Sequence, residues 1–258
     1  MIKFTIITCT YQAAHELPRT VESVLCQTYA DIEHLILDGL SSDATVQIAR
    51  DYARRSAEAD NGHEVVVVSE KDGGLYDAMN KGIRKATGDY LLFLNAGDAF
   101  PSPDTLEMVA GSVGDGEPLP GVLYGDTDIV DDKGRFLRHR RLQPPERLSW
   151  RSFRQGMLVC HQAFYVRADL AKANPYDLSY RYSADVDWCI RVMKAAERGG
   201  LELKNVGGVV VNYLDGGMSI KNHRASLRER FRLMRCHYGL LPTLAMHAWF
   251  VLRALIKK

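Results

Sequence analysis

The stretch Ile2-Lys3-Phe4-Thr5-Ile6-Ile7-Thr8-Cys9 is rich in apolar and β-branched side chains and predicts a buried β-strand. Three further runs of this kind occur at residues 32–37, 64–68 and 90–94. Segments with the apolar spacing of helices separate them, the first near residues 17–25. Because strands and helices alternate, this part of the chain predicts an α/β fold in which a mainly parallel central sheet is flanked by helices on both faces.

Polar side chains follow all four predicted strands. In parallel sheets, ligands bind beyond the carboxyl ends of the strands, so these side chains are expected to gather at one edge. Carboxylates are costly to bring together without partners, and a bound cation or the hydroxyl groups of a ribose would compensate them. The residues concerned are Thr8, Thr10, Tyr11, Asp38, Asp72, Asn95 and Asp98.

The second part of the chain has a less regular pattern. Its predicted elements are strands at 122–124 and 206–213, an extended stretch at 156–166, a hairpin turn at 131–134 and a helix at 186–196. The sequence contains no repeat and no low-complexity linker. We therefore expect one domain over residues 1–220 and a helical C-terminal extension over residues 221–258.

The composition and the distribution of charge limit the classes of protein to which the chain can belong. The chain has 258 residues, 46% hydrophobic and 25% charged, which is typical of a globular protein and excludes a disordered or collagen-like chain. Residues 1–132 carry 9 Lys and Arg against 23 Asp and Glu, whereas residues 133–258 carry 24 against 9. This asymmetry indicates an anionic partner for the second half, such as a membrane surface or nucleic acid, or else attraction between the halves.

The cysteines and the apolar segments bear on the compartment. The five cysteines are widely spaced without a C-x-x-C pair, so neither a disulfide scaffold nor a zinc site is expected and a reducing cytosol is the natural environment. The N-terminal apolar run is too short for a signal peptide. No stretch reaches the roughly 18 uninterrupted apolar residues of a membrane span. These features predict a cytoplasmic protein.

The C-terminal extension is basic and amphipathic. Residues 221–258 hold 9 Lys and Arg against a single acidic residue, Glu229. Helical spacing places Leu227, Phe231 and Met234 on one face and Arg228, Arg232 and Arg235 on another, with Trp249 and Phe250 further on. Basic helices with such faces lie in membrane interfaces. We expect peripheral binding to an anionic membrane surface, at the inner face of the cell membrane; the alternative is a helix packed on the protein's own core.

Several motifs occur in a fixed order along the first hundred residues. They are Thr8-Cys9-Thr10-Tyr11, then Asp38-Gly39-Leu40-Ser41-Ser42-Asp43, then Asp72-Gly73-Gly74-Leu75-Tyr76-Asp77-Ala78-Met79-Asn80-Lys81-Gly82, and finally Leu94-Asn95-Ala96-Gly97-Asp98. Together they resemble family 2 glycosyltransferases with the GT-A fold, over about residues 2–220. The run from Tyr76 to Gly82 is similar to the bacterial subgroup that builds polysaccharide repeat units.

The resemblance implies a donor site for a nucleotide-sugar, with UDP or GDP as the nucleotide. The residues implied are Thr8, Tyr11, Asp38 and Asp72 at the base and ribose, Asn80 and Lys81 on a helix facing the donor, and Asn95. A carboxylate at Asp38 could accept hydrogen bonds from both ribose hydroxyls, or it could form a local turn before the next helix. Lys81 could meet phosphate or remain solvated.

Residues 95–98 stand where the resembled family has its D-x-D motif. Asn95 replaces the first Asp, and the spacing is one residue longer. Asp98 is therefore the implied ligand of a divalent cation, Mg²⁺ or Mn²⁺, with the nucleotide diphosphate supplying further coordination. The alternative is a turn in which Asp98 caps the region 101–110.

A second group of implied residues belongs to the acceptor side. Asp185, in Ser183-Ala184-Asp185-Val186-Asp187-Trp188, falls on the position of the catalytic base, although Ala184 replaces the usual Glu. A carboxylate there can take the proton of an attacking hydroxyl; the alternative is a simple helix cap. Asp187 is expected to cap or orient. The resemblance also implies His161 and Gln162 at the acceptor and Gly216-Gly217-Met218-Ser219 as a segment closing over the donor. The alternative for His161 is a structural histidine. His223 is either a further metal or phosphate ligand or a surface residue.

The sequence thus predicts an inverting glycosyltransferase of polysaccharide biosynthesis. It would pass a sugar from a nucleotide-sugar to a hydroxyl of a lipid-linked saccharide, with a divalent cation. One alternative is a polyprenyl-phosphate sugar synthase, in which the acceptor is a phosphate and a base matters little. Another is a nucleotide-sugar binding protein without turnover, favoured by Asn95 and Ala184. Nucleic acid is not an expected partner, because the sequence has no recognisable nucleic-acid-binding motif.

Overall fold

The computed structural model describes residues 1–114, 116, 118–216 and 223–256. Strands and helices alternate through its first half, as the sequence predicts. The elements are β1 (Phe4–Thr10), α1 (Leu17–Leu25), β2 (Ile32–Asp38), α2 (Thr45–Ala59), β3 (Glu64–Ser69), α3 (Leu75–Lys85), β4 (Tyr90–Phe93) and α4 (Thr105–Val113). Each of the strands β1, β2 and β4 consists almost wholly of buried side chains, because helices cover both sides of the sheet.

The second half adds shorter elements and the C-terminal helices. They are β5 (Val122–Val130), β6 (Phe136–His139), η1 (Trp150–Gln155), η2 (His161–Ala163), β7 (Phe164–Arg167), α5 (Ala168–Ala173), α6 (Ala184–Arg198), β8 (Leu203–Leu214), α8 (His223–Tyr238) and α9 (Leu240–Ile256). The predicted turn at residues 131–134 is confirmed, since it joins β5 to its antiparallel partner β6 and Gly134 has a φ of +80°. The extended stretch predicted at 156–166 is wrong over residues 161–163, which form the short helix η2.

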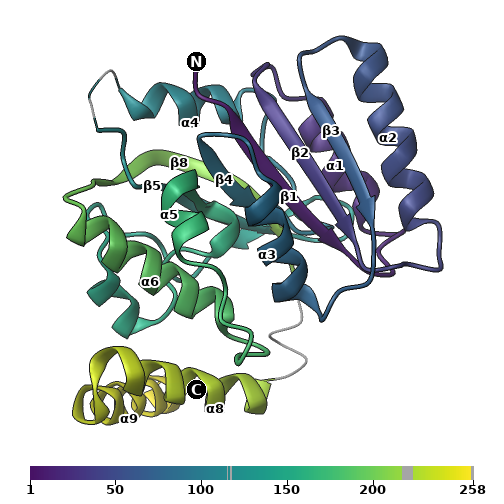
Figure 1. Ribbon diagram of the computed structural model, residues 1–258. Coiled ribbons are helices and arrows are strands. Elements are labelled where there is room, and N and C mark those ends of the chain that lie inside the picture. Colours follow the sequence, from purple (N-terminus) through teal and green to yellow (C-terminus); the bar gives the residue numbers. More distant parts are fainter. Residues whose placement is uncertain (115, 117, 217–222, 257–258) are drawn as a thin grey trace.

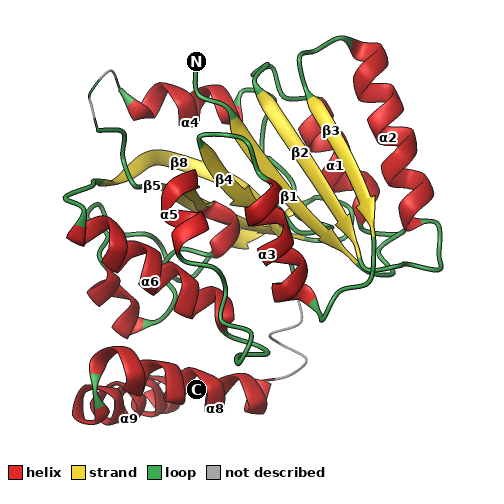
Figure 2. Cartoon of the chain, in the orientation of Figure 1, coloured by secondary structure: helices red, strands yellow, loops and turns green. Residues whose placement is uncertain are grey.

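The strands form one sheet in the order β3-β2-β1-β4-β7-β5-β6, with β8 paired to β5. The pairs β1–β2, β2–β3, β1–β4 and β5–β8 are parallel, whereas β7 runs antiparallel to both β4 and β5. Helices α3 and α6 lie in front of this sheet in Figure 1, and α1 lies behind it. The predicted α/β fold with a flanked central sheet is therefore confirmed, as the secondary-structure colouring of Figure 2 also shows.

An aromatic cluster fixes α6 against the sheet. Trp188 of α6 is fully buried, stacks on Tyr176 at a centroid distance of 4.9 Å, and meets Phe93 of β4 edge-on at 5.5 Å. Such ring contacts add to the large apolar area that each aromatic side chain buries. The cluster therefore holds the beginning of α6 near the carboxyl end of β4.

The C-terminal helices α8 and α9 lie together at the bottom of Figure 1, next to α6. Tyr238 of α8 stacks on Trp150 of η1 at 5.5 Å, and Leu233 and Met234 are buried. Leu227, by contrast, is 44% exposed. The apolar face of α8 is thus used partly for packing on the rest of the protein. Within the described residues, none of the helices has the length and apolarity needed to cross a membrane.

Candidate active site

A cavity of about 810 Å³ opens beyond the carboxyl ends of β1 and β4. Its wall includes the first residues of α3, the beginning of α6, the end of β8 and one residue of α8. Six of the residues singled out from the sequence lie on this wall: Tyr11, Asn95, Asp98, His161, Gln162 and Asp185. The structure therefore brings two strand-end motifs, at Tyr11 and at residues 95–98, to one place with the acceptor-side motif that begins at residue 183.

Asp98 is a buried residue of the cavity wall, and both of its carboxylate oxygens accept hydrogen bonds. Its Oδ1 accepts a hydrogen bond from the Leu214 backbone N–H at 2.9 Å, and its Oδ2 accepts one from Gln162 Nε2 at 3.0 Å. Burial raises the pKa of Asp98 to about 6, even though these hydrogen bonds favour the charged form. Asp98 does not cap α4, whose N-cap position is Asp104.

His161 links Asn95 to Asp185. Its Nε2 lies 3.4 Å from the Asn95 side-chain amide nitrogen, and its Nδ1 lies 3.6 Å from Asp185 Oδ2. If Nε2 accepts from the amide of Asn95, the neutral imidazole must carry its proton on Nδ1, facing the carboxylate. The imidazole ring is also held at 6.3 Å from the ring of Phe93.

Asp185 is an ionised carboxylate at the start of a helix. Burial alone would raise its pKa, but the His161 imidazole, whose Nδ1 lies 3.6 Å from Oδ2, and the charge of Arg230 hold the pKa below its usual range. The N-terminal end of α6 also favours a negative charge. Because Asp185 faces the cavity and is charged, it is able to accept a proton from a bound hydroxyl.

Tyr11 lines the cavity, and Gly39 brings Asp72 close to it, although Asp72 and Gly39 are not themselves on the cavity wall. A Cβ atom on Gly39 would lie 2.6 Å from Asp72 Oδ2 and 3.5 Å from the Tyr11 ring, so any larger residue here would displace the Asp72 carboxylate from its present position. The Tyr11 side chain is 68% exposed and presents an open ring face. An aromatic ring beside a carboxylate is suited to stacking a nucleotide base and accepting from its hydroxyl or N–H groups.

Asp38 is placed differently from the other predicted donor residues. It is 2% exposed and does not line the cavity. Burial alone would raise the pKa of its carboxyl, but hydrogen bonds, chiefly from Ser41 and Ser69, hold the pKa below its usual range. The backbone N–H of Ser41 donates to Oδ2 at 2.9 Å, which is the local turn that the sequence left open as an alternative.

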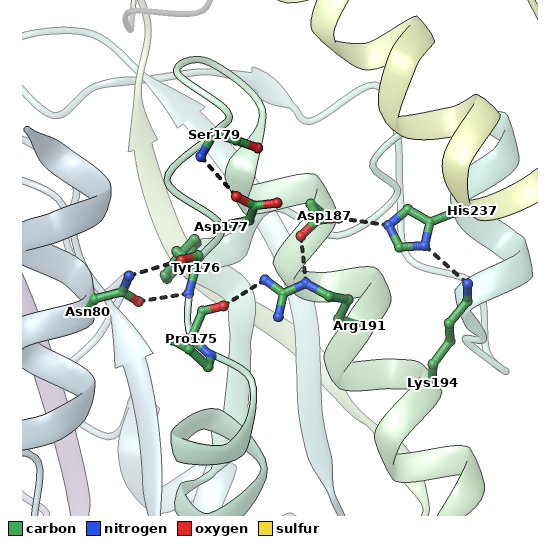
Figure 3. Close-up of polar contacts among 9 residues, drawn as sticks. All are labelled: Asn80, Pro175, Tyr176, Asp177, Ser179, Asp187, Arg191, Lys194 and His237. Atoms are coloured by element: carbon green, nitrogen blue, oxygen red, sulfur yellow. Dashed lines mark hydrogen bonds and ion pairs between the residues drawn. The ribbon is translucent and has the colours of Figure 1, made fainter.

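Thr8, Asn80 and Lys81 also lie away from the cavity wall. The Thr8 hydroxyl donates to the Leu94 carbonyl at 2.7 Å. The Asn80 amide donates to the Tyr176 carbonyl and accepts from the Tyr176 N–H, as Figure 3 shows. Lys81 Nζ lies 3.0 Å from a carboxylate oxygen of Glu70. In the structure these three side chains connect elements of the fold, and we leave them out of the proposed donor site.

Sequence reasoning missed the arginines of the cavity wall. Arg140, Arg181 and Arg230 come from three separate segments. The only available signal was the basic character of the second half, which does not say where an individual side chain lies. Gly216 lines the cavity as well, but residues 217–219 of the predicted closing segment and the side chain of His223 lie outside the described residues.

A divalent cation fits the cavity only together with a substrate. No group of three or more His, Cys, Asp or Glu residues that could hold a metal occurs among the residues described. Mg²⁺, however, commonly uses one or two carboxylates and takes its remaining ligands from water and phosphates. Asp98 meets this need, because it is a desolvated carboxylate whose oxygens each retain a lone pair beyond their present hydrogen bond.

Comparison with known proteins identifies the family. A family model described as Glycosyl transferase family 2 matches residues 5–172. The chain belongs to this family. A PGL/p-HBAD biosynthesis glycosyltransferase of Mycobacterium tuberculosis is 37% identical over 193 residues, covering 73% of this chain and 68% of the relative. An uncharacterized glycosyltransferase of the same species is 33% identical over 196 residues, covering 75% of this chain and 70% of the relative.

Solved structures show that this family 2 glycosyltransferase has the GT-A fold. The crystal structure of S. aureus TarS 1-349 in complex with UDP-GlcNAc has a TM-score of 0.69 at 16% identity, covering 91% of this chain and 65% of the TarS 1-349 chain. The mannosyltransferase PcManGT from Pyrobaculum calidifontis, in complex with GDP-Man and Mn²⁺, has a TM-score of 0.57 at 17% identity, covering 98% of this chain and 81% of PcManGT. The family and fold predicted from the motifs are confirmed.

Proposed function

We propose that the chain is an inverting glycosyltransferase that moves a sugar from a nucleotide-sugar to a hydroxyl of a lipid-linked saccharide in polysaccharide biosynthesis. The observation that carries this proposal is the ionised Asp185, held beside His161 in the cavity that also contains Asp98. Asp185 would take the proton of the acceptor, and Asp98 would help to balance the charge on a leaving diphosphate.

The donor site is proposed at the strand ends. Tyr11 would stack on the base, and Asp72 would accept from the base or ribose beside Gly39. The fold neighbours TarS and PcManGT were solved with UDP-GlcNAc and GDP-Man, which supports a UDP- or GDP-sugar as the donor. A Mg²⁺ or Mn²⁺ ion bound with the donor would balance the charge on the diphosphate, with Asp98 as its protein ligand and Asn95 at the donor.

The base is proposed to act on the face of the sugar opposite the leaving group. Asp185 removes the proton as the acceptor hydroxyl attacks the anomeric carbon, and this direction of attack inverts the configuration. His161 orients the carboxylate and, with Gln162, borders the acceptor. Because the pKa of Asp185 is lowered, the carboxylate is already deprotonated at neutral pH and ready to accept.

A membrane location is proposed from the surface of α9. Five large apolar side chains of α9 are each about half exposed or more: Leu240, Leu241, Leu244, Trp249 and Leu252. Apolar and aromatic side chains beside a basic helix are the chemistry of an interfacial segment, which would hold the enzyme at the inner face of the cell membrane near a lipid-linked acceptor.

The experiment measures nucleoside diphosphate release by the purified chain. A panel of UDP- and GDP-sugars is offered with bacterial membranes as the acceptor source. Asp185→Asn is expected to lower turnover by about 10²–10⁴-fold while donor affinity hardly changes. Asp132→Asn, at an exposed acidic residue outside the cavity, is the matched control. Equal turnover in both variants would reject Asp185 as the base.

A phosphate acceptor is the second candidate. Arg181 and Arg230 stand on the cavity wall with Asp185, and guanidinium groups are suited to phosphate. A phosphate is already ionised and needs no general base. Retained turnover of Asp185→Asn with polyprenyl phosphate as the acceptor would therefore favour a polyprenyl-phosphate sugar synthase.

A further inference from the structure

Helix α8 is anchored directly to the loop before the acceptor-side motif. The two carboxylate oxygens of Glu229 accept hydrogen bonds from the backbone N–H groups of Arg181 and Tyr182, at 2.8 and 2.7 Å. Ser226, one turn earlier, lies 3.5 Å from Ser183 between their hydroxyl oxygens. A carboxylate that receives two backbone donors is a strong and directional contact. It sets the position of α8 relative to Asp185.

The next residue of α8, Arg230, extends to the cavity wall. It lines the same cavity as Asp185 and Asp98. Its Nε atom is buried and has no hydrogen-bond partner in the part of the chain that the structure describes. A buried guanidinium N–H without an acceptor is costly, and the usual compensation is an anion or water brought to it.

Arg140 is a cavity arginine whose N–H donors are already hydrogen-bonded within the protein. Its guanidinium donates to the carbonyl oxygens of Leu142, Leu158 and Met157 at 2.6 to 2.9 Å. Arg140 is therefore committed to holding the backbone around the cavity. Arg230 has no such set of carbonyl partners among the described residues, and its charge acts on Asp185 from the same cavity wall, so its buried Nε–H is available to an anionic ligand in the cavity.

We propose that Arg230 binds a phosphate group of a substrate in this cavity. The proposal rests on the proposed glycosyl transfer and adds a binding residue to it. A guanidinium fork matches two phosphate oxygens and carries a fixed charge. The neighbouring Arg181 adds a second positive charge to the same wall. The phosphate comes either from the diphosphate of the donor or from a phosphorylated lipid acceptor, and the experiment separates these sources.

The first arm measures binding of UDP and GDP by isothermal titration calorimetry, with uridine and guanosine as phosphate-free references. Arg230→Gln is compared with Arg228→Gln, which removes the same charge from an exposed position of the same helix. If the phosphate is the donor's, Arg230→Gln weakens diphosphate binding by about 10- to 100-fold and leaves nucleoside binding unchanged. Arg230→Lys keeps the charge but not the fork, and recovers part of the affinity.

The second arm measures co-sedimentation with phosphatidylcholine vesicles that contain polyprenyl phosphate. If the phosphate is the acceptor's, Arg230→Gln binds UDP and GDP like the wild type but loses about tenfold or more in affinity for these vesicles. Arg230→Gln that matches Arg228→Gln in both arms overturns the proposal. A wild-type chain that binds neither UDP nor GDP instead overturns the proposed function, so the two failures are distinguishable.

Discussion

Asp187 of α6 accepts a hydrogen bond from His237 of α8 at 2.7 Å, and this contact joins the C-terminal helices to the helix that carries Asp185 (Figure 3). Lys194 lies 3.0 Å from the other ring nitrogen of His237. An ammonium group can only donate, so Nδ1 of His237 must accept and Nε2 must carry the proton given to Asp187. The second oxygen of Asp187 accepts from Arg191 at 2.6 Å. The network therefore gives each of these three contacts one donor and one acceptor.

Asp187→Asn is expected to destabilise the protein by about 2–3 kcal/mol at pH 7, because it leaves Arg191 and His237 without a charged partner. Burial alone would raise the pKa of Asp187, but the hydrogen bonds from His237 and Arg191 hold it below its usual range. A lowered folded-state pKa contributes stability above the unfolded value of about 3.9, and this contribution is lost as pH falls through the folded value. Urea unfolding should therefore show the gap between the two proteins at pH 7 and its closure below about pH 4.

The matched control for this network is Asp177→Asn. Asp177 is exposed and accepts only a local backbone hydrogen bond from Ser179, which an asparagine can also accept. Its effect should stay within about 0.5 kcal/mol. A loss equal to that of Asp187→Asn would mean that the Asp187 network contributes nothing specific.

The ionised Asp98 carboxylate is predicted to lower the stability of the folded protein at neutral and higher pH. Its folded-state pKa of about 6 lies above the unfolded value, so the folded state holds the proton more tightly. Stability from this group is complete below about pH 4 and falls as pH rises towards 6. In EDTA at pH 8, Asp98→Asn should therefore melt at a higher temperature than the wild type, and at pH 4 the two should coincide. Added Mn²⁺ with a nucleoside diphosphate should stabilise only the wild type.

Activity provides the second check on Asp98. Asp98→Ala should abolish the metal-dependent part of turnover. Gln162→Glu, which replaces the hydrogen-bond donor facing Asp98 by a carboxylate, should raise the pKa of Asp98 further and move the requirement for metal to higher concentration. Metal dependence that survives unchanged in Asp98→Ala would remove Asp98 from the proposed metal site.

His161→Gln tests whether the imidazole positions the proposed base. The imidazole of His161, 3.6 Å from the carboxylate, helps to hold the pKa of Asp185 below its usual range. Without the imidazole the pKa of Asp185 should rise, so the acid limb of the kcat profile should shift to higher pH, with a loss in kcat of about tenfold at neutral pH. The measurement is the pH dependence of kcat and KM for both proteins. A fall in kcat with an unshifted acid limb would contradict the coupling between the two side chains.

The strand-end motifs were predictable because parallel strands that alternate with helices can place their carboxyl ends at only one edge. Whether an individual side chain points into the cavity or away from it was less predictable. Cys9 lines the cavity, whereas Thr8, one position earlier, turns to the opposite side and bonds Leu94 and His34. Side chains alternate along a strand, so an uncertainty of one residue reverses the assignment. Asn80 shows the same effect on a helix, where its amide faces Tyr176 instead of the cavity.

The position of Arg230 on the cavity wall could not be predicted from the sequence, for a different reason. The amphipathic pattern of residues 221–258 says which side chains of a helix share a face, but not which surface of the protein that face meets. That surface is set by single tertiary contacts, above all by Glu229 with the backbone of residues 181–182. The pattern alone was equally consistent with membrane contact and with packing on the protein's own core. The structure shows that α8 packs on the rest of the protein, where Leu233 is buried.

The membrane prediction now rests on α9. Leu241 is 78% exposed, and Leu244 and Trp249 are 48% and 50% exposed. Their replacement by serine should lower binding to anionic vesicles about tenfold or more, because each buried apolar side chain contributes about 1.5–3 kcal/mol. The basic residues of α8 should make wild-type binding fall with salt. Co-sedimentation with anionic and neutral vesicles, at low and high salt, measures both effects.

The matched control replaces apolar residues that are equally exposed elsewhere. Phe136 and Leu137 of β6 are 55% and 48% exposed, and their replacement by serine should leave vesicle binding unchanged if α9 is the contact surface. All variants should keep the wild-type affinity for nucleoside diphosphates, because none of these side chains lines the cavity. If the wild type sediments with neither kind of vesicle at any salt concentration, the exposed face of α9 does not bind membranes, and a lipid-linked acceptor would have to reach Asp185 without this anchor.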